Sequence, residues 1–183
     1  MQIPDSNRLS FRLMDDSDAN ILFELDQDPE VMKYLTKGKP PTRNDIDEIF
    51  VPRMLAYRNP QRAWGMWHVS DKASGQFLGW VLIRPMYFFS GQPNETNLEL
   101  GWRFKRSVWG KGIATEAAQH IAQYVAQHNA EVRQVSAIAV PENLASIKVM
   151  QKLGMTFQKQ YLHDDPLGAV DVVLYSADIE TVR

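Results

Sequence analysis

Two glycines, Gly110 and Gly112, stand just before a run of helix-forming residues that begins at Ile113. The segment upstream of them, which ends at Phe104, is predicted to be a β-strand. A helix start presents free backbone amides and the positive end of the helix macrodipole, and residues without a Cβ atom let an anion come close to those amides. The pattern therefore predicts an anion-binding turn, to which Lys111 can add a charge-assisted contact.

Other glycine-rich phosphate sites do not fit this turn. A P-loop would need Gly where Lys105 stands and Ser or Thr where Gly112 stands. A dinucleotide-binding turn would need a small residue in place of Thr115, and Glu131 precedes the next predicted strand instead of ending it. Taken alone, the two glycines could also ease a tight strand-to-helix connection without binding any ligand.

A second motif lies downstream, where Asn143-Leu144-Ala145-Ser146 opens a predicted helix that Gly154 ends. Asn143 follows Pro141 and has the side chain that a helix N-cap favours. It could also contact a ligand, since capping uses only one of its polar atoms.

Together the two segments resemble the signature motifs of the GNAT superfamily of N-acetyltransferases. The first family motif, Gln/Arg-x-x-Gly-x-Gly/Ala, is matched by Trp109 to Ala114 except that Trp109 occupies the Gln/Arg position. The sequence Trp-Gly-Lys-Gly followed by Ala-Thr-Glu-Ala is most similar to the Rim type, the ribosomal-protein N-terminal acetyltransferases. The resemblance runs from Arg8 to the end of the chain.

This resemblance implies an α/β (α+β) fold with a mixed, mostly antiparallel central sheet flanked by helices and with splayed strands at the cofactor site. It implies acetyl-CoA as the acyl donor. The four histidines, at positions 68, 120, 128 and 163, show no metal-ligand spacing on a common face, so we expect no metal. The edge of the strand around Arg103 would pair with the pantetheine arm, the turn amides would hold the pyrophosphate, and Asn143 would contact coenzyme A. The residues assigned to the cofactor are Trp102, Arg103, Phe104, Trp109, Gly110, Lys111, Gly112, Ile113, Ala114, Thr115 and Asn143.

The proton-transfer residues follow the family less closely. Many relatives use a tyrosine to protonate the departing thiolate, but Met150 stands at that position here. Some Rim-type enzymes use the motif serine, so we hypothesise that Ser146 is the general acid. For the general base, the resemblance offers Glu99 on the strand before the glycine turn and Asp165 after the second helix, with an ordered water leading to either carboxylate.

The elements that must position these residues alternate along the chain. Period-two and helical patterns predict strands interleaved with helices and no internal repeat. A helix after Asp16 and Ser17 and another from Asn44 or Asp45, interrupted or kinked by Pro52, follow the first strand. The remaining predicted elements are strands at 8–14, 63–70, 76–86, 98–104, 132–140, 156–162 and 170–177 and helices at 113–128 and 143–153.

Composition narrows the possible partners. The 183 residues are 44% hydrophobic and can bury one core, so we expect a single N-acetyltransferase domain over residues 1–183. The 20 basic and 22 acidic residues nearly balance, which predicts no direct nucleic-acid or membrane partner. The chain has no cysteine, so no protein thiol can carry the acyl group. The first residues do not resemble a secretory signal, and we expect a cytoplasmic protein.

The leading hypothesis is an enzyme that moves an acetyl group from acetyl-CoA to a primary amine, with a protein N-terminal α-amino group favoured as acceptor. Small amines such as polyamines, amino sugars and amino acids stay open, as do a noncatalytic coenzyme A-binding module and a nucleotide-binding protein. The aromatic residues 87–89 are candidates for an acceptor pocket. Since relatives commonly dimerise, the resemblance also allows a homodimer.

Overall fold

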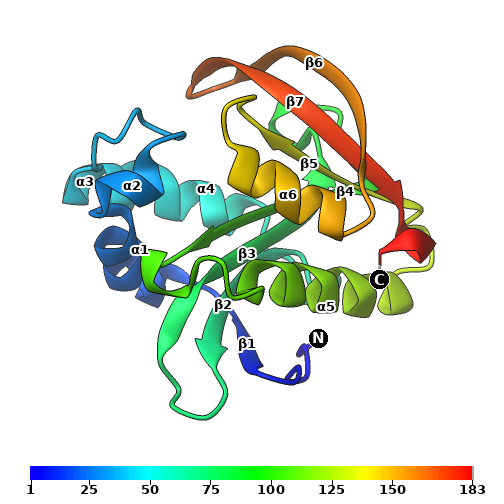
Figure 1. Ribbon diagram of the computed structural model, residues 1–183, viewed down its shortest axis with the longest axis horizontal. Coiled ribbons are helices and arrows are strands. Elements are labelled where there is room, and N and C mark those ends of the chain that lie inside the picture. Colours follow the sequence, from blue (N-terminus) through cyan, green and yellow to red (C-terminus); the bar gives the residue numbers. More distant parts are fainter. Residues whose placement is uncertain (183) are drawn as a thin grey trace.

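The computed structural model describes residues 1–182, which form a seven-stranded sheet flanked by helices (Figure 1). The strands lie in the order β1-β2-β3-β4-β5-β7-β6, and β4 with β5 is the parallel pair among antiparallel neighbours. This confirms the predicted mixed, mostly antiparallel sheet. The strands are β1 Leu9–Leu13, β2 Gly65–Asp71, β3 Phe77–Met86, β4 Asn94–Phe104, β5 Gln134–Ala139, β6 Thr156–Asp165 and β7 Gly168–Asp178.

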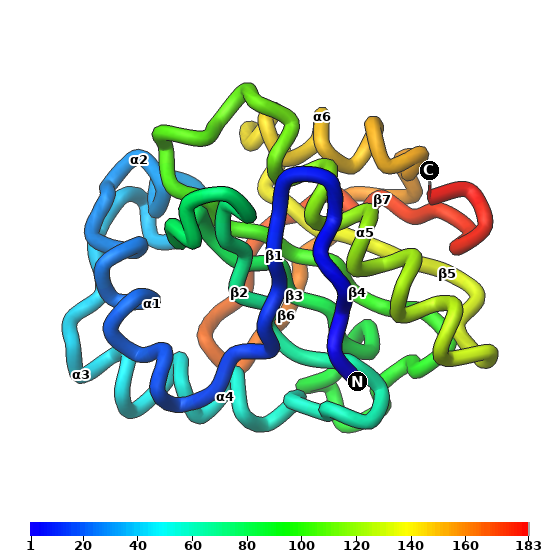
Figure 2. The backbone as a smooth tube through the Cα atoms, turned by 90° about the horizontal axis from the view of Figure 1, so that it is seen from below, coloured from blue at the N-terminus to red at the C-terminus, as the bar shows by residue number. Residues whose placement is uncertain are grey.

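Helices cover both faces of this sheet, in two groups that lie apart in both views (Figure 1, Figure 2). Val81 and Ile83 of β3 pack with α5 and α6 in one apolar cluster, whereas Leu82 between them packs with α1 and α4 in another. The alternation follows from the period of two in a strand. The helices are α1 Ala19–Asp26, α2 Pro29–Met32, α3 Arg43–Asp45, α4 Val51–Ala56, α5 Ile113–His128 and α6 Leu144–Lys152.

The two parallel strands separate soon after they meet. Pairing of β4 with β5 runs only from Asn97, opposite Gln134, to Glu99, opposite Ser136. Beyond Glu99, β4 stays paired with β3 as far as Phe104, while β5 stays paired with β7. The facing edges of β4 and β5 therefore diverge, which confirms the splayed strands that the family resemblance implied.

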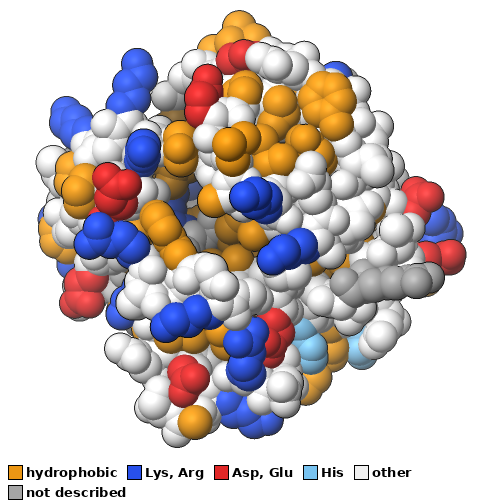
Figure 3. Space-filling model, viewed as in Figure 1, with side chains coloured by type: hydrophobic (Ala, Val, Ile, Leu, Met, Phe, Trp, Pro, Cys, Tyr) orange, Lys and Arg blue, Asp and Glu red, His pale blue; other side chains and the backbone are white. Residues whose placement is uncertain are grey.

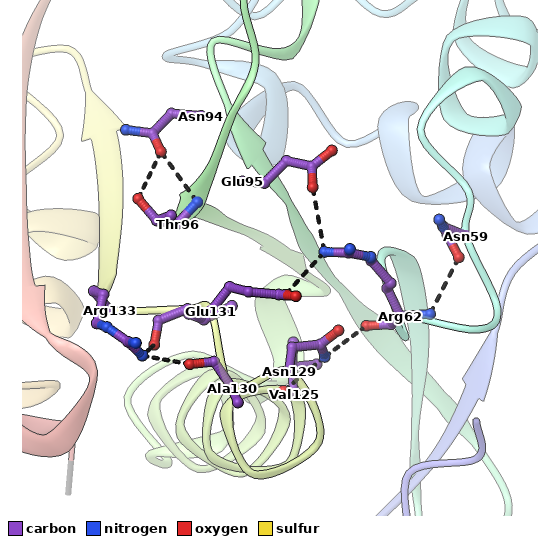
Figure 4. A network of polar contacts seen from close by, with 11 residues as sticks. Asn59, Arg62, Asn94, Glu95, Thr96, Val125, Asn129, Ala130, Glu131 and Arg133 are labelled. Atoms are coloured by element: carbon purple, nitrogen blue, oxygen red, sulfur yellow. Dashed lines mark hydrogen bonds and ion pairs between the residues drawn. The ribbon is translucent and has the colours of Figure 1, made fainter.

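A polar network holds the C-terminal end of α5 (Figure 4). The side-chain amide of Asn129 donates to the carbonyl oxygens of Val125 at 2.7 Å and Arg62 at 3.1 Å. The Arg62 guanidinium lies 3.2 Å from Glu95 at the start of β4 and 3.3 Å from Glu131 before β5. These contacts join the C-terminal end of α5 to the beginnings of β4 and β5. They lie away from the ends at which the two strands diverge.

Several element boundaries differ from the sequence expectations. Asp15, not Asp16, caps the first helical segment, because its side chain accepts from the Ser17 amide. The second helical segment begins at Arg43 behind the capping side chain of Thr42, and a π-helical stretch at 46–50 leads into the turn that carries Pro52. Strand β4 begins at Asn94 inside the expected loop, because Asn94 pairs with Met86 across a bulge. No helix within residues 1–182 is long and apolar enough to span a bilayer.

Candidate active site

The glycine turn lies at the N-terminus of the sixteen-residue helix α5. Gly110 and Gly112 have φ values of 75° and 76°, a left-handed backbone that glycine adopts without strain. Gly112 is the N-cap residue and has no capping side chain, and a Cβ atom at Gly110 would meet nothing within 4 Å. The first amides of α5 thus keep an open approach, as a bound pyrophosphate requires.

Trp109 has a structural role at the position where the family has Gln or Arg. Its indole Nε1 donates to the carbonyl oxygen of Phe104 at 2.9 Å, which closes the loop between the end of β4 and the turn. Trp109 as a whole is 48% exposed. Trp109 therefore holds the turn in place from outside the core.

Arg8 supports the turn from the beginning of the chain, a contact that the sequence did not reveal. Its Nη1 donates to the carbonyl oxygen of Lys111 at 3.0 Å, and its Nε donates to Glu116 at 2.6 Å. Glu116, in the first turn of α5, also accepts from the Ser6 hydroxyl at 2.7 Å. Partial burial opposes the charge of Glu116, but the hydrogen bonds from Ser6 and Arg8 outweigh burial and lower its pKa.

The side chains of the predicted cofactor strand are engaged within the protein. Trp102 and Phe104 pack against the core on the α5 face. Arg103 points to the opposite face, where its guanidinium pairs with Asp26 of α1. Burial raises the pKa of Asp26, although Arg103 acts in the other direction. Strand β4 therefore presents its backbone edge, and not free side chains, to the gap between β4 and β5.

The second motif begins α6 as expected. The side-chain oxygen of Asn143 accepts from the Ser146 amide at 3.1 Å, so Asn143 is the N-cap and its side-chain nitrogen is not needed for capping. The Ser146 hydroxyl is half-buried and makes no hydrogen bond to another residue among those described. Met150, at the family's tyrosine position, is 1% exposed and lies in the apolar core. It cannot donate a proton there.

Glu99 occupies the last β4–β5 pair, at the point where the strands diverge. It faces away from α5, since its neighbours Leu98 and Leu100 belong to the core on that side. Two nitrogens of Arg84, directly opposite on β3, lie 2.9 Å from its Oε2 atom. Both side chains are 12% exposed, and no described residue hydrogen-bonds Oε1. Glu99 thus has one fixed oxygen and one that can accept a proton.

Asp165 is held differently. Its two oxygens accept from Arg53 at 2.8 and 3.1 Å, and one of them also accepts from the Leu167 amide at 2.8 Å. These contacts fasten the β6–β7 turn to α4. Arg53 lies far from Asp165 in the sequence, and Arg84 lies on a different strand from Glu99. Local motifs therefore did not identify either arginine.

Aromatic side chains connect the two ion pairs. The Phe89 ring has the Arg53 guanidinium 3.9 Å from its centroid and that of Arg84 at 5.1 Å. Phe88 and Phe89 meet Tyr57 edge to face, with centroids 5.8 and 6.2 Å away. Burial raises the pKa of Tyr57 to about 12, so its phenol stays protonated. Of the predicted pocket residues, Phe89 thus lies beside Arg84, the partner of Glu99, and Tyr57 packs against both Phe88 and Phe89.

The molecular surface is hollowed between the α1–α4 helices and α6, with Lys and Arg side chains along the rim (Figure 3). A cavity of about 550 Å³ lies between α1, α2 and residues 105–107. Its acidic lining residues Glu24 and Asp28 are matched by Lys105 and Arg106, and Arg106 lies 3.4 Å from Asp28. Among residues 1–182, no group of three or more metal-binding side chains comes together.

Residues 8–156 match the model of the acetyltransferase (GNAT) domain. The chain belongs to the GNAT acetyltransferase family. As a GNAT acetyltransferase it uses acetyl-CoA as acyl donor, and the turn, the free β4 edge and Asn143 fit that ligand. The uncharacterized protein YkkB of Bacillus subtilis strain 168 is 34% identical over 159 residues, covering 84% of this chain and 85% of that protein.

Two solved structures share this GNAT fold. RimL, a ribosomal L7/L12 α-N-protein acetyltransferase in complex with coenzyme A, has a TM-score of 0.75 at 17% identity and covers 99% of both chains. The aminoglycoside acetyltransferase AAC(6′)-Ib in complex with coenzyme A has a TM-score of 0.74 at 19% identity, covering 94% of this chain and 96% of that one. Proteins named for different acceptors are thus similar to this enzyme in fold.

The support that Arg8 gives to the glycine turn can be measured directly. We expect Arg8→Met to weaken binding of coenzyme A by about three- to tenfold, as loss of one or two hydrogen bonds would. Isothermal titration calorimetry checks this. Lys72→Met is the matched control, because Lys72 also contacts the N-terminal segment, 3.8 Å from Asp5, but does not reach the turn. Equal affinities in the two variants would show that Arg8 does not organise the turn.

Proposed function

We propose that this GNAT enzyme acetylates the α-amino group of a protein or peptide N-terminus, and that residues 1–183 act as one N-acetyltransferase domain. The observation that supports this acceptor is charge pairing. Glu99 is paired with Arg84, and Asp165 is paired with Arg53. These two carboxylates therefore leave no excess negative charge beside the proposed acceptor site. A polycationic amine would gain little attraction here, whereas a peptide N-terminus presents a single amine.

The cofactor side of the site is made largely of backbone. The turn amides and the free edge of β4 supply donors and acceptors for a ligand rich in amide and phosphate groups. Asn143 adds a side-chain amide. Bound acetyl-CoA supplies the thioester carbonyl that the amine attacks, and the diverging strands leave backbone groups available at that point.

Glu99 is our proposed general base. An α-amino group has an ordinary pKa of about 8, so only a small driving force is needed to remove its proton near neutral pH. Arg84 holds Oε2 of Glu99, and Oε1 accepts the proton directly or through one water. Asp165, with both oxygens engaged, positions the β6–β7 turn. Ser146 is the proposed donor of a proton toward the departing sulfur.

The acceptor class is tested with a panel of amines and purified enzyme. We expect thiol release and a mass increase of one acetyl group with some peptides that have a free N-terminus, and much slower release with kanamycin or spermidine. The same peptides with a blocked N-terminus and a free lysine serve as control. Faster turnover of kanamycin or spermidine than of every peptide would refute the proposed acceptor.

The choice of general base is tested by comparing two isosteric variants. We expect Glu99→Gln to lower kcat at least about a hundredfold, the usual effect of losing a general base, with coenzyme A affinity unchanged. Asp165→Asn should change kcat by less than about threefold and act mainly on the acceptor KM. An equal loss of kcat in both variants would contradict the distinction that we draw between the two carboxylates.

The general acid is tested by Ser146→Ala. The capping hydrogen bond uses the Ser146 amide and not its hydroxyl, so the helix should keep its start. We expect kcat to fall about tenfold or more while the affinity for coenzyme A stays the same. Single-turnover kinetics with a competent peptide measures the step, and unchanged turnover would remove Ser146 from the mechanism.

A further inference from the structure

Tyr87 has an unusual backbone for an aromatic residue. With φ of 61° and ψ of 31° it lies in the left-handed region, which only Lys37 and Ala63 share among the other non-glycine residues between 1 and 182. A side chain is disfavoured there because Cβ crowds the backbone, and Gly or Asn would fit better. Strain of this kind commonly marks a residue whose side chain has a use.

The backbone role of this position does not require a ring. The Tyr87 carbonyl oxygen accepts from the Ser90 amide at 2.9 Å and from the Ser90 hydroxyl at 2.8 Å. These bonds close the short 3-10 turn over Phe88–Ser90, which sets Phe88 and Phe89 against Tyr57. Any residue that tolerates the left-handed region could form the same turn.

Tyr87 stands two residues before Phe89, whose ring lies against the guanidinium groups of both Arg53 and Arg84. Tyr87 is half-buried, and its hydroxyl makes no hydrogen bond to the described part of the chain. Tyr161 of β6 is also half-buried, and burial, then Tyr87 and Glu99, raise the pKa of Tyr161 to about 12. Tyr161 shares its strand face with Asp165, which is anchored to Arg53. Tyr87, before β4, and Tyr161, on β6, thus belong to the two segments whose Phe89 and Asp165 contact Arg53.

We propose that Tyr87 is an acceptor-binding residue whose ring contacts the group attached to the acceptor's amine, and that it selects amines bearing an apolar or planar group. This inference rests on the proposed function, because it concerns the acceptor side of that same site. Since Glu99 and Asp165 are each paired with an arginine, the aromatic rings at 87–89 offer apolar surface for recognition. For a peptide, the selected group is the side chain of the first residue.

The test uses binding and not turnover, so it is independent of whether peptides are acetylated. The probe is coenzyme A joined from its sulfur through a methylene-carbonyl bridge to the α-amino group of Phe-Ala amide. We expect wild-type enzyme to bind this conjugate more tightly than coenzyme A. Tyr87→Asn should lower conjugate affinity about tenfold or more while leaving coenzyme A affinity within about twofold. Tyr87→Phe should keep the conjugate affinity.

Lys37→Asn is the matched control, because Lys37 has a similar φ of 56°. It should leave both affinities unchanged, and the melting temperature of Tyr87→Asn should not fall by more than about 3 °C. An unchanged ratio of the two affinities in Tyr87→Asn would overturn the proposal. Should that variant fail to fold, wild-type enzyme still decides: equal affinity for conjugates of Phe-Ala amide and Lys-Ala amide would overturn it too.

Discussion

The early divergence of β4 and β5 is the constraint on which the rest of the site depends. Parallel strands end at the same edge of a sheet, so the connections that follow them begin side by side. Here those connections start α5 and α6, whose first residues carry the glycine turn and Asn143. Divergence after Glu99 then frees two backbone edges between the helix starts. One topological feature thereby brings together the first amides of α5, an unpaired strand edge and a carboxylate at the vertex.

Placing carboxylates in such an opening has an electrostatic cost. A half-buried carboxylate loses hydration, and a paired arginine offsets that loss. If either partner of such a pair is removed, the other is left as an unpaired charge. The structure repeats this solution three times along the face opposite α5, with Glu99 and Arg84, Asp165 and Arg53, and Asp26 and Arg103. The pairs give each of these three carboxylates a matching cation, and they also tie β3, β4, β6, α1 and α4 together.

How much of this was predictable depended on whether the determining contacts are local. The glycine turn and the Asn143 cap follow from residues adjacent in sequence, so the pattern identified both and the fold with them. Arg84 opposite Glu99 requires the strand register, and Arg53 beside Asp165 joins residues 112 positions apart. Neither follows from a motif. The isolated Arg84 within the apolar strand β3 was the available signal, since a cation there needs a partner.

The proposed cofactor half of the site is built from backbone groups, whereas the proposed acceptor half is built from side chains. This difference bears on how enzymes of this fold differ in their acceptors. Turn amides and strand edges present the same groups with almost any side chains, so a short glycine pattern suffices to specify them. The other half consists of side chains from α4, the turn after β3 and the β6–β7 hairpin, held by ion pairs and ring contacts. Substitutions there change the shape and charge of the wall without disturbing the sheet. Proteins with 17% and 19% identity to this chain can therefore share its frame yet be named for different acceptors.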